Sequence, residues 1–175
     1  MMFAAGLGTR MKPLTDDRPK PMINVAGRPL IDHALALAQD VGPDAIVANL
    51  HYKPQILSDH LVPLGVQTVL ETPDILETGG GLRNALPLLG QGPVYTLNTD
   101  AICAGPNPLR LLADTWEPEK MDALLICIPP SRARGYSGAG DFALNAEGQL
   151  TRGAGMVYGG VQIIKTDLLH DVTDA

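Results

Sequence analysis

The chain has 175 residues, of which 45% are hydrophobic and 4% aromatic, so it can form one domain with a substantial core. Its formal net charge of −6 argues against a general nucleic-acid binder, because sequence-independent binding needs Lys and Arg to neutralise phosphates. No apolar run approaches the roughly 20 residues of a membrane span, and the opening MMFAA is too short and uncharged for a signal peptide. Cys103 and Cys127 are isolated and lack CxxC spacing, which favours a reducing compartment. We therefore expect a cytoplasmic protein with no nucleic-acid or membrane partner.

Short apolar runs bounded by Gly, Pro or Asp alternate along the chain with segments of helical periodicity. The apolar runs predict strands at residues 1–5, 45–50, 66–70, 94–98 and 123–128. The periodic segments predict helices at residues 29–41, 54–62, 80–89 and 108–116. Strands that alternate with helices imply right-handed crossovers and a mainly parallel sheet.

The first expected helix, at residues 29–41, shows how these boundaries are set. Pro29 suits a first helical turn, and Gly42-Pro43 is typical of a helix end. The apolar residues at helical spacing are Leu30, Ala34, Leu37 and Val41.

From about residue 135 the pattern changes. The stretch FALNAEGQLTRG predicts a hairpin that turns at Glu147-Gly148, and MVYGGVQII predicts one more strand. No repeat or linker interrupts the chain. The sequence thus predicts a single α/β domain, a Rossmann-like open, mainly parallel sheet with a small antiparallel elaboration on its ligand side.

The loop after the first strand, FAAGLGTRMKPLTDDRPK at residues 3–20, combines closely spaced glycines with fixed cations. Residues 1–28 carry five basic and two acidic side chains, a net charge of +3, so the remainder carries −9. Glycine lets backbone N–H groups approach a ligand that a Cβ would keep away. This pattern favours a small polyanion such as a phosphate ester; the alternative for GLGTR alone is a solvated hairpin tip.

The common phosphate-binding fingerprints are missing. GLGTRM lacks the third glycine of G-x-G-x-x-G, and nothing matches G-x-x-x-x-G-K-[ST]. What remains is A-A-G-x-G-x-R-M-x-P-L-T, followed by P-K-P at residues 19–21 and by LETGGGLRNALPLLG at residues 76–90. In this order the motifs resemble the sugar-1-phosphate nucleotidyltransferases, in particular the N-acetylmuramate-1-phosphate uridylyltransferases, with the mannose-1-phosphate guanylyltransferases as near relatives. The resemblance runs from residue 3 to about 165 and implies a GT-A-like fold.

The resemblance implies an enzyme that joins a sugar 1-phosphate to the nucleotidyl group of a nucleoside triphosphate and releases pyrophosphate. Negative charge must then be stabilised on the α-phosphoryl and leaving groups, and little proton transfer is needed. By resemblance, the loop holds the nucleotide through Ala5, Gly6, Gly8 and Thr9, Arg10 grips the β- and γ-phosphates, and Lys20 reaches the α-phosphate and the sugar phosphate. Arg10 and Lys20 are the candidate catalytic residues.

Asp100 follows the apolar run VYTLN, at the position where open α/β sheets collect ligands. It resembles the metal-binding aspartate of the family, whose usual context is N-G-D, although Thr99 replaces the glycine here. A carboxylate in this place suits Mg²⁺, the expected cofactor. The alternative is an ordinary aspartate in a turn.

Two further groups of residues are assigned by the resemblance. Glu77, Thr78 and Gly79 are expected around the pyrimidine base, although Thr78 could instead cap the helix that follows. The sugar is expected at Gly140 and Asp141 in GAGDF and at Tyr158 and Gly160 in VYGGVQ. For Asp141, a hydrogen-bonded role in the hairpin is an equal alternative.

The family also supplies a second metal-binding aspartate near its C-terminus, in a context like W-x-D-V-G-T. Asp167, Asp171 and Asp174 do not stand in that context. We therefore expect residues 1–175 to be one nucleotidyltransferase domain that lacks its C-terminal segment.

Two hypotheses follow. The first is a Mg²⁺-dependent transferase that uses UTP and N-acetylmuramate 1-phosphate; the open alternatives are a mannose-1-phosphate guanylyltransferase and a glucose-1-phosphate thymidylyl- or uridylyltransferase. The second is a non-catalytic module that binds a nucleotide or nucleotide sugar. The sequence does not determine the base, the sugar or the oligomeric state.

Overall fold

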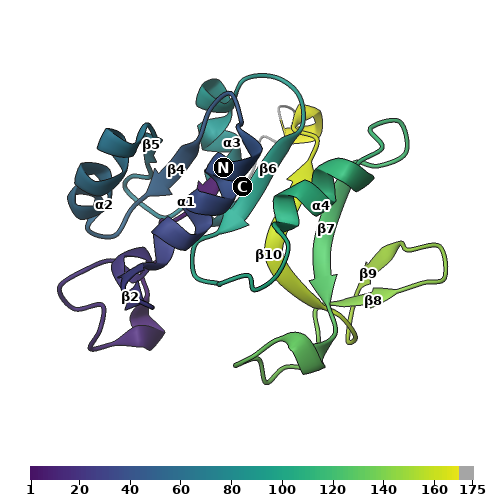
Figure 1. Cartoon of the computed structure of the whole chain (residues 1–175). Coiled ribbons are helices and arrows are strands. Elements are labelled where there is room, and N and C mark those ends of the chain that lie inside the picture. The colour runs from purple at the N-terminus through teal and green to yellow at the C-terminus, as the bar shows by residue number, and fades with distance from the viewer. Residues whose placement is uncertain (170–175) are drawn as a thin grey trace.

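A six-stranded sheet forms the centre of the protein (Figure 1). The computed structural model describes residues 1–169. The strand order is β5-β4-β1-β6-β10-β7, with parallel pairing from β5 through β6, and β10 runs antiparallel to both of its neighbours. The strands are β1 (Met2–Phe3), β4 (Val47–Leu50), β5 (Gln67–Leu70), β6 (Val94–Asn98), β7 (Ala123–Ile128) and β10 (Val157–Ile164). The mainly parallel sheet that the sequence predicted is confirmed.

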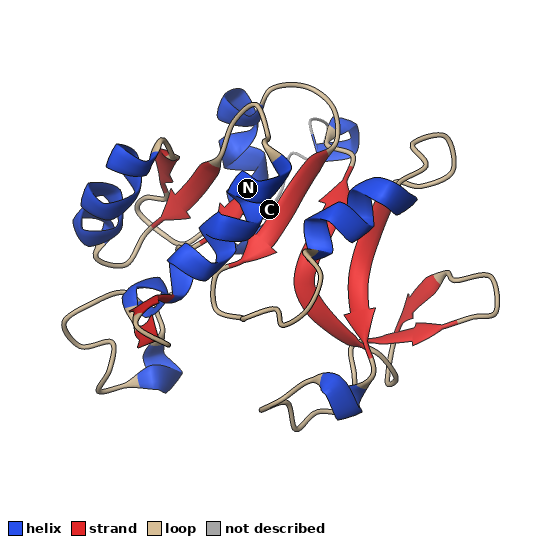
Figure 2. Ribbon diagram, viewed as in Figure 1, coloured by secondary structure: helices blue, strands red, loops and turns tan. Residues whose placement is uncertain are grey.

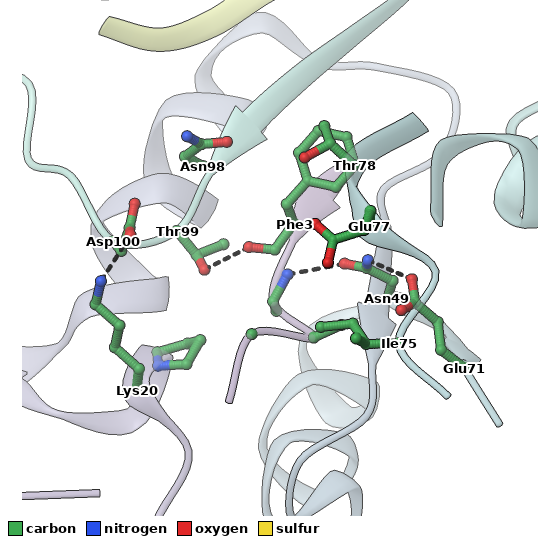
Figure 3. Close-up of a pocket in the computed structure, with 14 residues that line it drawn as sticks. Phe3, Lys20, Asn49, Glu71, Ile75, Glu77, Thr78, Asn98, Thr99 and Asp100 are labelled. Atoms are coloured by element: carbon green, nitrogen blue, oxygen red, sulfur yellow. Dashed lines mark hydrogen bonds and ion pairs between the residues drawn. The ribbon is translucent and has the colours of Figure 1, made fainter. Parts of the chain in front are cut away.

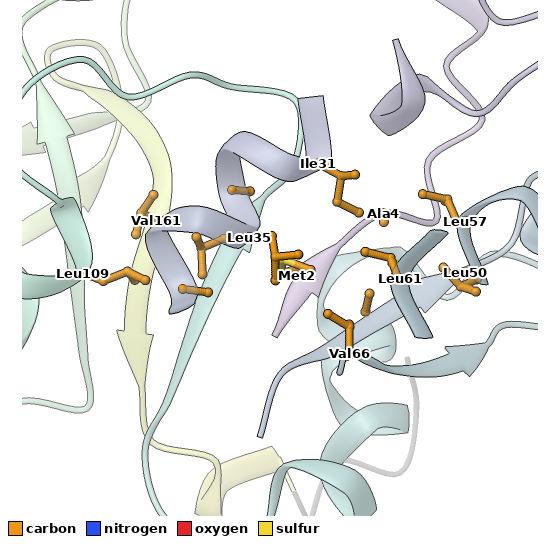
Figure 4. Close-up of a cluster of buried hydrophobic side chains, with 14 of the residues drawn as sticks. Met2, Ala4, Ile31, Leu35, Leu50, Leu57, Leu61, Val66, Leu109 and Val161 are labelled. Atoms are coloured by element: carbon orange, nitrogen blue, oxygen red, sulfur yellow. The ribbon is translucent and has the colours of Figure 1, made fainter. Parts of the chain in front are cut away.

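Helices cover both faces of this sheet (Figure 2). They are α1 (Leu30–Val41), α2 (Pro54–Leu61), α3 (Glu77–Leu89) and α4 (Pro108–Thr115). Residues of α1, α2 and α4 pack into one buried cluster with Met2, Ala48 and Val161 (Figure 4). Residues of α3 pack on the opposite face, with Val47 and Val94. The adjacent residues Val47 and Ala48 thus pack into clusters on opposite faces of the sheet, as expected for a strand buried on both faces.

Five short 3₁₀ helices and two small hairpins complete the described chain. The 3₁₀ helices are η1 (Thr9–Met11), η2 (Lys20–Met22), η3 (Val62–Leu64), η4 (Pro130–Arg132) and η5 (Asp167–Leu169). The hairpins are β2 (Asn24–Val25) with β3 (Arg28–Pro29), which the sequence did not predict, and β8 (Phe142–Leu144) with β9 (Leu150–Arg152), which it did. The Gly148 amide donates to the Asn145 carbonyl at 3.1 Å, which confirms the expected turn.

Two helix starts differ from the prediction. Pro29 belongs to β3 and is the N-cap of α1, so it does not lie in the first helical turn. In α1 the stripe that is fully buried consists of Leu30, Ile31, Ala34, Leu35 and Ala38, whereas Leu37 and Val41 only pack against its margin. In α3 the helix begins at Glu77, not at residue 80. Thr78 therefore lies inside the first turn and does not cap the helix. The predicted end of α1 is confirmed, because Gly42 is left-handed with φ 63°.

Candidate active site

A pocket opens at the edge of the sheet where the parallel strands β1, β4, β5 and β6 have their carboxyl ends (Figure 3). Open α/β sheets bind ligands at this edge. The lining residues are Phe3, Ala4, Ala5, Gly6, Lys20, Pro21, Asn49, Glu71, Ile75, Glu77, Thr78, Asn98, Thr99 and Asp100. Six residues that the sequence predicted as nucleotide or metal ligands are among them: Ala5, Gly6, Lys20, Glu77, Thr78 and Asp100.

The glycine loop leaves the central strand β1, which is parallel to both of its neighbours, so it is not a hairpin tip. Gly8 is left-handed with φ 64°, and a Cβ there would lie 2.9 Å from Thr15 Cγ2 and 3.1 Å from Lys20 Cβ. The buried Thr15 hydroxyl donates to the Gly8 carbonyl at 3.0 Å. Gly8 is therefore required by the fold of the loop, and it shapes the pocket without lining it.

Gly6 differs from Gly8, because it is exposed, lines the pocket and would place a Cβ in open space. Thr9 and Arg10 belong to η1 and are exposed outside the pocket lining. No hydrogen bond or ion pair joins Arg10 to another residue within 1–169. Its guanidinium is thus available to a ligand that extends along the loop.

Lys20 and Asp100 meet at the pocket, 80 residues apart in sequence. Lys20 Nζ lies 2.7 Å from Asp100 Oδ2, and the two side chains are 24% and 43% exposed (Figure 3). Pro19 and Pro21 flank Lys20 and restrict the backbone at η2. The pair places a cation and an accessible carboxylate at one point of the pocket.

Thr99, which takes the place of the glycine expected from the resemblance, packs inside the protein. Its side chain is 2% exposed, and its hydroxyl donates to the Phe3 carbonyl at 2.7 Å. This bond ties the end of β6 to the end of β1. It thereby fixes the start of the loop next to Asp100.

The first turn of α3 forms another wall of the pocket. Glu77 has φ 57°, in the left-handed region that a non-glycine residue adopts only when its surroundings impose it. Gly79 is exposed beside Thr78, and a Cβ there would meet no atom within 4 Å. Packing within the described residues therefore does not require glycine at position 79, and Gly79 lies outside the pocket lining.

Two polar residues of the pocket, Asn49 and Glu71, were not anticipated from the sequence. They are 3% and 1% exposed and lie at the carboxyl ends of β4 and β5. The only available signal was a polar residue near the end of each apolar run: Asn49 before the last residue of AIVANL and Glu71 at the end of VQTVLE. That signal was weak because strands often end in polar residues.

The four residues expected at the sugar lie outside the pocket lining. Asp141 Oδ2 accepts from the Tyr158 amide at 2.8 Å, so Asp141 does have the hydrogen-bonded structural role considered as its alternative. The Tyr158 ring contacts Phe142 edge-on, and burial raises the pKa of Tyr158 to about 12. Gly140 packs tightly on the backbone of Gly155.

Gly160 packs against Asn98, a residue of the pocket wall. It has φ 74° and lies where the pairing of β10 with β7 shifts register. A Cβ at this position would lie 3.0 Å from Asn98 Cβ, and Asn98 lines the pocket. Gly160 thus lets β10 pass close to the end of β6.

The part of the chain that the structure describes offers few alternative catalytic groups. None of its histidines lines the pocket, and no group of three or more His, Cys, Asp or Glu residues could hold a metal ion. Asp167 follows β10 at the opposite edge of the sheet from Asp100. Asp171 and Asp174 lie outside the described residues. No helix within residues 1–169 is long and apolar enough to cross a membrane.

Residues 1–138 match the model of the MobA-like NTP transferase domain. The chain belongs to this family. It is 40% identical over 189 residues to the N-acetylmuramate alpha-1-phosphate uridylyltransferase of Caulobacter vibrioides, with 99% of this chain and 78% of the relative covered. It is 32% identical over 183 residues to the enzyme of the same name from Neisseria meningitidis, with 98% and 77% covered.

The chain is also similar to a more distant relative and to two solved structures. A mannose-1-phosphate guanylyltransferase catalytic subunit from Dictyostelium discoideum is 34% identical over 112 residues, which covers 61% of this chain and 31% of that one. The crystal structure of HddC from Yersinia pseudotuberculosis with GMP-PN has a TM-score of 0.77 at 21% identity and covers 99% of this chain and 79% of HddC. A UDP-glucose pyrophosphorylase complexed with UDP-glucose has a TM-score of 0.74 at 14% identity, with 97% and 76% covered. These structures share the nucleotidyltransferase fold, and the protein is a nucleotidyltransferase.

Proposed function

We propose that the protein transfers the uridylyl group of UTP to N-acetylmuramate 1-phosphate and depends on Mg²⁺. The observation that carries the proposal is the contact between Lys20 Nζ and Asp100 Oδ2, 2.7 Å apart beside a glycine loop at the carboxyl edge of the sheet. The names of the two relatives covered over most of their length support UTP and N-acetylmuramate 1-phosphate as the substrates.

In the proposed reaction an oxygen of the sugar 1-phosphate attacks the α-phosphorus of UTP and forms a new P–O bond. The bond from the α-phosphorus to the oxygen that bridges to the β-phosphorus breaks, and its electrons leave with pyrophosphate. No proton needs to move at the reacting phosphoryl group. A pocket whose described lining holds no histidine is compatible with this chemistry.

The chain then contributes positive charge and backbone donors in fixed places. We assign Lys20 to the α-phosphate and the attacking phosphate, because it is the cation that lines the pocket. We assign Arg10 to the β- and γ-phosphates, because its side chain is exposed on η1, outside the pocket lining. Ala5 and Gly6 offer the backbone of the loop to the nucleotide, and Gly8 and Thr9 hold its shape. Charge fixed before the reaction lowers the barrier without reorganisation.

Asp100 is the residue that would hold Mg²⁺. It is an accessible carboxylate beside the proposed phosphate site, and Mg²⁺ in such sites is usually held by one or two carboxylates together with substrate phosphates and water. When bound, the ion would neutralise charge on the phosphate oxygens. In the free protein Lys20 donates to Asp100. If Asp100 also held Mg²⁺, the Lys20 ammonium group would be free to bind the phosphates.

The remaining assignments concern the base and the sugar. We assign Glu77, Thr78 and Gly79 to the uracil, because Glu77 and Thr78 line the pocket at the first turn of α3. We assign Gly140, Asp141, Tyr158 and Gly160 to the sugar, although none of them lines the pocket. Asp141 and Gly160 act chiefly by positioning the start of β10 against Asn98.

The test is pyrophosphate release with a panel of UTP, GTP, dTTP and CTP against four acceptors: the 1-phosphates of N-acetylmuramate, N-acetylglucosamine, mannose and glucose. N-acetylglucosamine 1-phosphate is the matched control, since it lacks only the lactyl ether. We expect UTP with N-acetylmuramate 1-phosphate to give the highest kcat/KM. A preference for GTP with mannose 1-phosphate, or nucleotide binding without turnover of any pair, would replace the proposal by one of its alternatives.

A further inference from the structure

Three hydrogen bonds join the glycine loop to the start of α3 through two buried side chains (Figure 3). The Ala4 amide donates to Asn49 Oδ1 at 2.8 Å, and Asn49 Nδ2 donates to Glu71 Oε1 at 2.7 Å. The Leu76 amide donates to Glu71 Oε2 at 2.9 Å. The series therefore begins at Ala4, the first residue of the loop after β1, and ends at the residue before α3.

Each polar side-chain atom of Asn49 and Glu71 has a hydrogen-bond partner in this series. Both oxygens of Glu71 accept a bond from an N–H group, and Asn49 uses its oxygen and its nitrogen toward opposite partners. A glutamine at position 71 has only one acceptor oxygen, so it can satisfy Asn49 or Leu76 but not both. Because Asn49 and Glu71 are almost completely buried, a lost partner is not replaced by bulk water.

Gly81 supplies the space that this arrangement needs. A Cβ at position 81 would lie 2.5 Å from Glu71 Oε1 and 2.8 Å from Asn49 Nδ2. These contacts are far closer than van der Waals distance, so an alanine at this position must displace one of the two side chains. The third glycine of LETGGG is thus explained by the Asn49–Glu71 pair, whereas Gly79 faces open space.

We infer that Asn49 and Glu71 form a positioning brace that fixes the distance between the glycine loop and the first turn of α3. The inference rests on the proposed function in one respect, because these two segments are assigned there to the phosphates and the base of one nucleotide. Glu71 is a positioning residue in this account. It acts through Ala4 and Leu76, and its carboxylate is turned away from solvent.

The first test compares Glu71→Gln with Asp32→Asn. The control also converts a hydrogen-bonded carboxylate to an amide. Asp32, on α1, is hydrogen-bonded to His60, on α2, and neither residue lines the pocket. Amide hydrogen exchange is followed by NMR in the free protein. We expect Glu71→Gln to speed exchange at Leu76 or Ala4 by about tenfold or more, and Asp32→Asn to leave both rates unchanged. Unchanged rates in Glu71→Gln would overturn the brace.

The second test measures UTP affinity by calorimetry for Glu71→Ala, Gly81→Ala and the double variant. We expect each single change to weaken UTP binding by about tenfold. The double variant should be little weaker than Glu71→Ala alone, because the added methyl then meets no carboxylate and the Asn49 amide nitrogen, freed from Glu71, can move out of its way. Effects that multiply in the double variant would overturn the role assigned to Gly81.

These outcomes separate the brace from the proposed function. If the parent protein binds no UTP, the proposed function fails, and the exchange rates in the free protein still decide whether the brace exists. If the parent binds UTP and Glu71→Gln binds it equally well, the brace does not position the nucleotide. A melting temperature for every variant, compared with that of Asp32→Asn, identifies changes caused by general loss of stability.

Discussion

Replacing Lys20 by methionine removes one charge from the pocket and keeps most of the side-chain volume. In the free protein this charge lies 2.7 Å from Asp100 Oδ2, and the Lys20 side chain is only 24% exposed. Two unit charges about 4 Å apart interact by about 4 kcal/mol at an effective dielectric constant of about 20. Loss of one preorganised group that stabilises developing charge costs about 2.7–4 kcal/mol. The second figure is a change in activation free energy and corresponds to a loss of about 100- to 1,000-fold in rate.

We therefore expect Lys20→Met to lower kcat by at least about a hundredfold, while the Kd for UTP changes much less. The reason for this split is that the charge is needed most where negative charge develops in the transition state. Pyrophosphate release gives kcat, and calorimetry gives the Kd. Lys12→Met is the matched control, since Lys12 is also in the loop but pairs with Asp16 at 3.7 Å on the surface. A Lys20→Met variant within about threefold of the parent kcat would refute the assignment.

Three further predictions concern the loop walls, the metal and the pH dependence of stability. Gly79→Ala should fold like the parent yet weaken UTP binding, whereas Gly8→Ala should lower the melting temperature because φ is 64° there; equal melting temperatures would contradict this. Asp100→Asn should raise the Mg²⁺ concentration for half-maximal pyrophosphate release, and an unchanged Mg²⁺ requirement would remove Asp100 from the metal site. Hydrogen bonds from Arg110 lower the pKa of Asp40 from 3.8 to about 2, so the stabilisation they give is complete above pH 4 and is lost as the pH falls toward 2. The melting temperatures of the parent and of Asp40→Asn should therefore differ at pH 6 and converge near pH 2.

The strands and most helices could be predicted because each is set by a local pattern. The strands at 94–98 and 123–128 coincide with β6 and β7, since an apolar run bounded by turn residues contains the information needed. The start of α3 could not be predicted in the same way. Three consecutive glycines are poor helix formers, and the helix begins at Glu77 where Glu71 accepts from the Leu76 amide. Tertiary contacts decide that boundary.

The candidate site was predictable to the extent that its parts are sequence motifs. The loop and Asp100 both follow strands of a parallel sheet, so their carboxyl ends had to meet at one edge, and Lys20 does contact Asp100. The roles of Asn49 and Glu71 depend on which strands are neighbours and on the path of the chain after β5. No local pattern encodes these features. The residues expected at the sugar lie outside the pocket lining for a related reason, since the placement of the β8–β9 hairpin and of β10 is also a tertiary feature.

Transfer of a nucleotidyl group to a sugar phosphate is tested most directly by ³¹P NMR of the parent protein with UTP, N-acetylmuramate 1-phosphate and Mg²⁺. The account predicts that the triphosphate and phosphomonoester signals disappear together, and that pyrophosphate and a diphosphate diester appear in equal amounts. Addition of excess pyrophosphate should regenerate UTP. Formation of UMP or inorganic phosphate without the diester, or unchanged spectra under conditions in which UTP binds, would contradict the account.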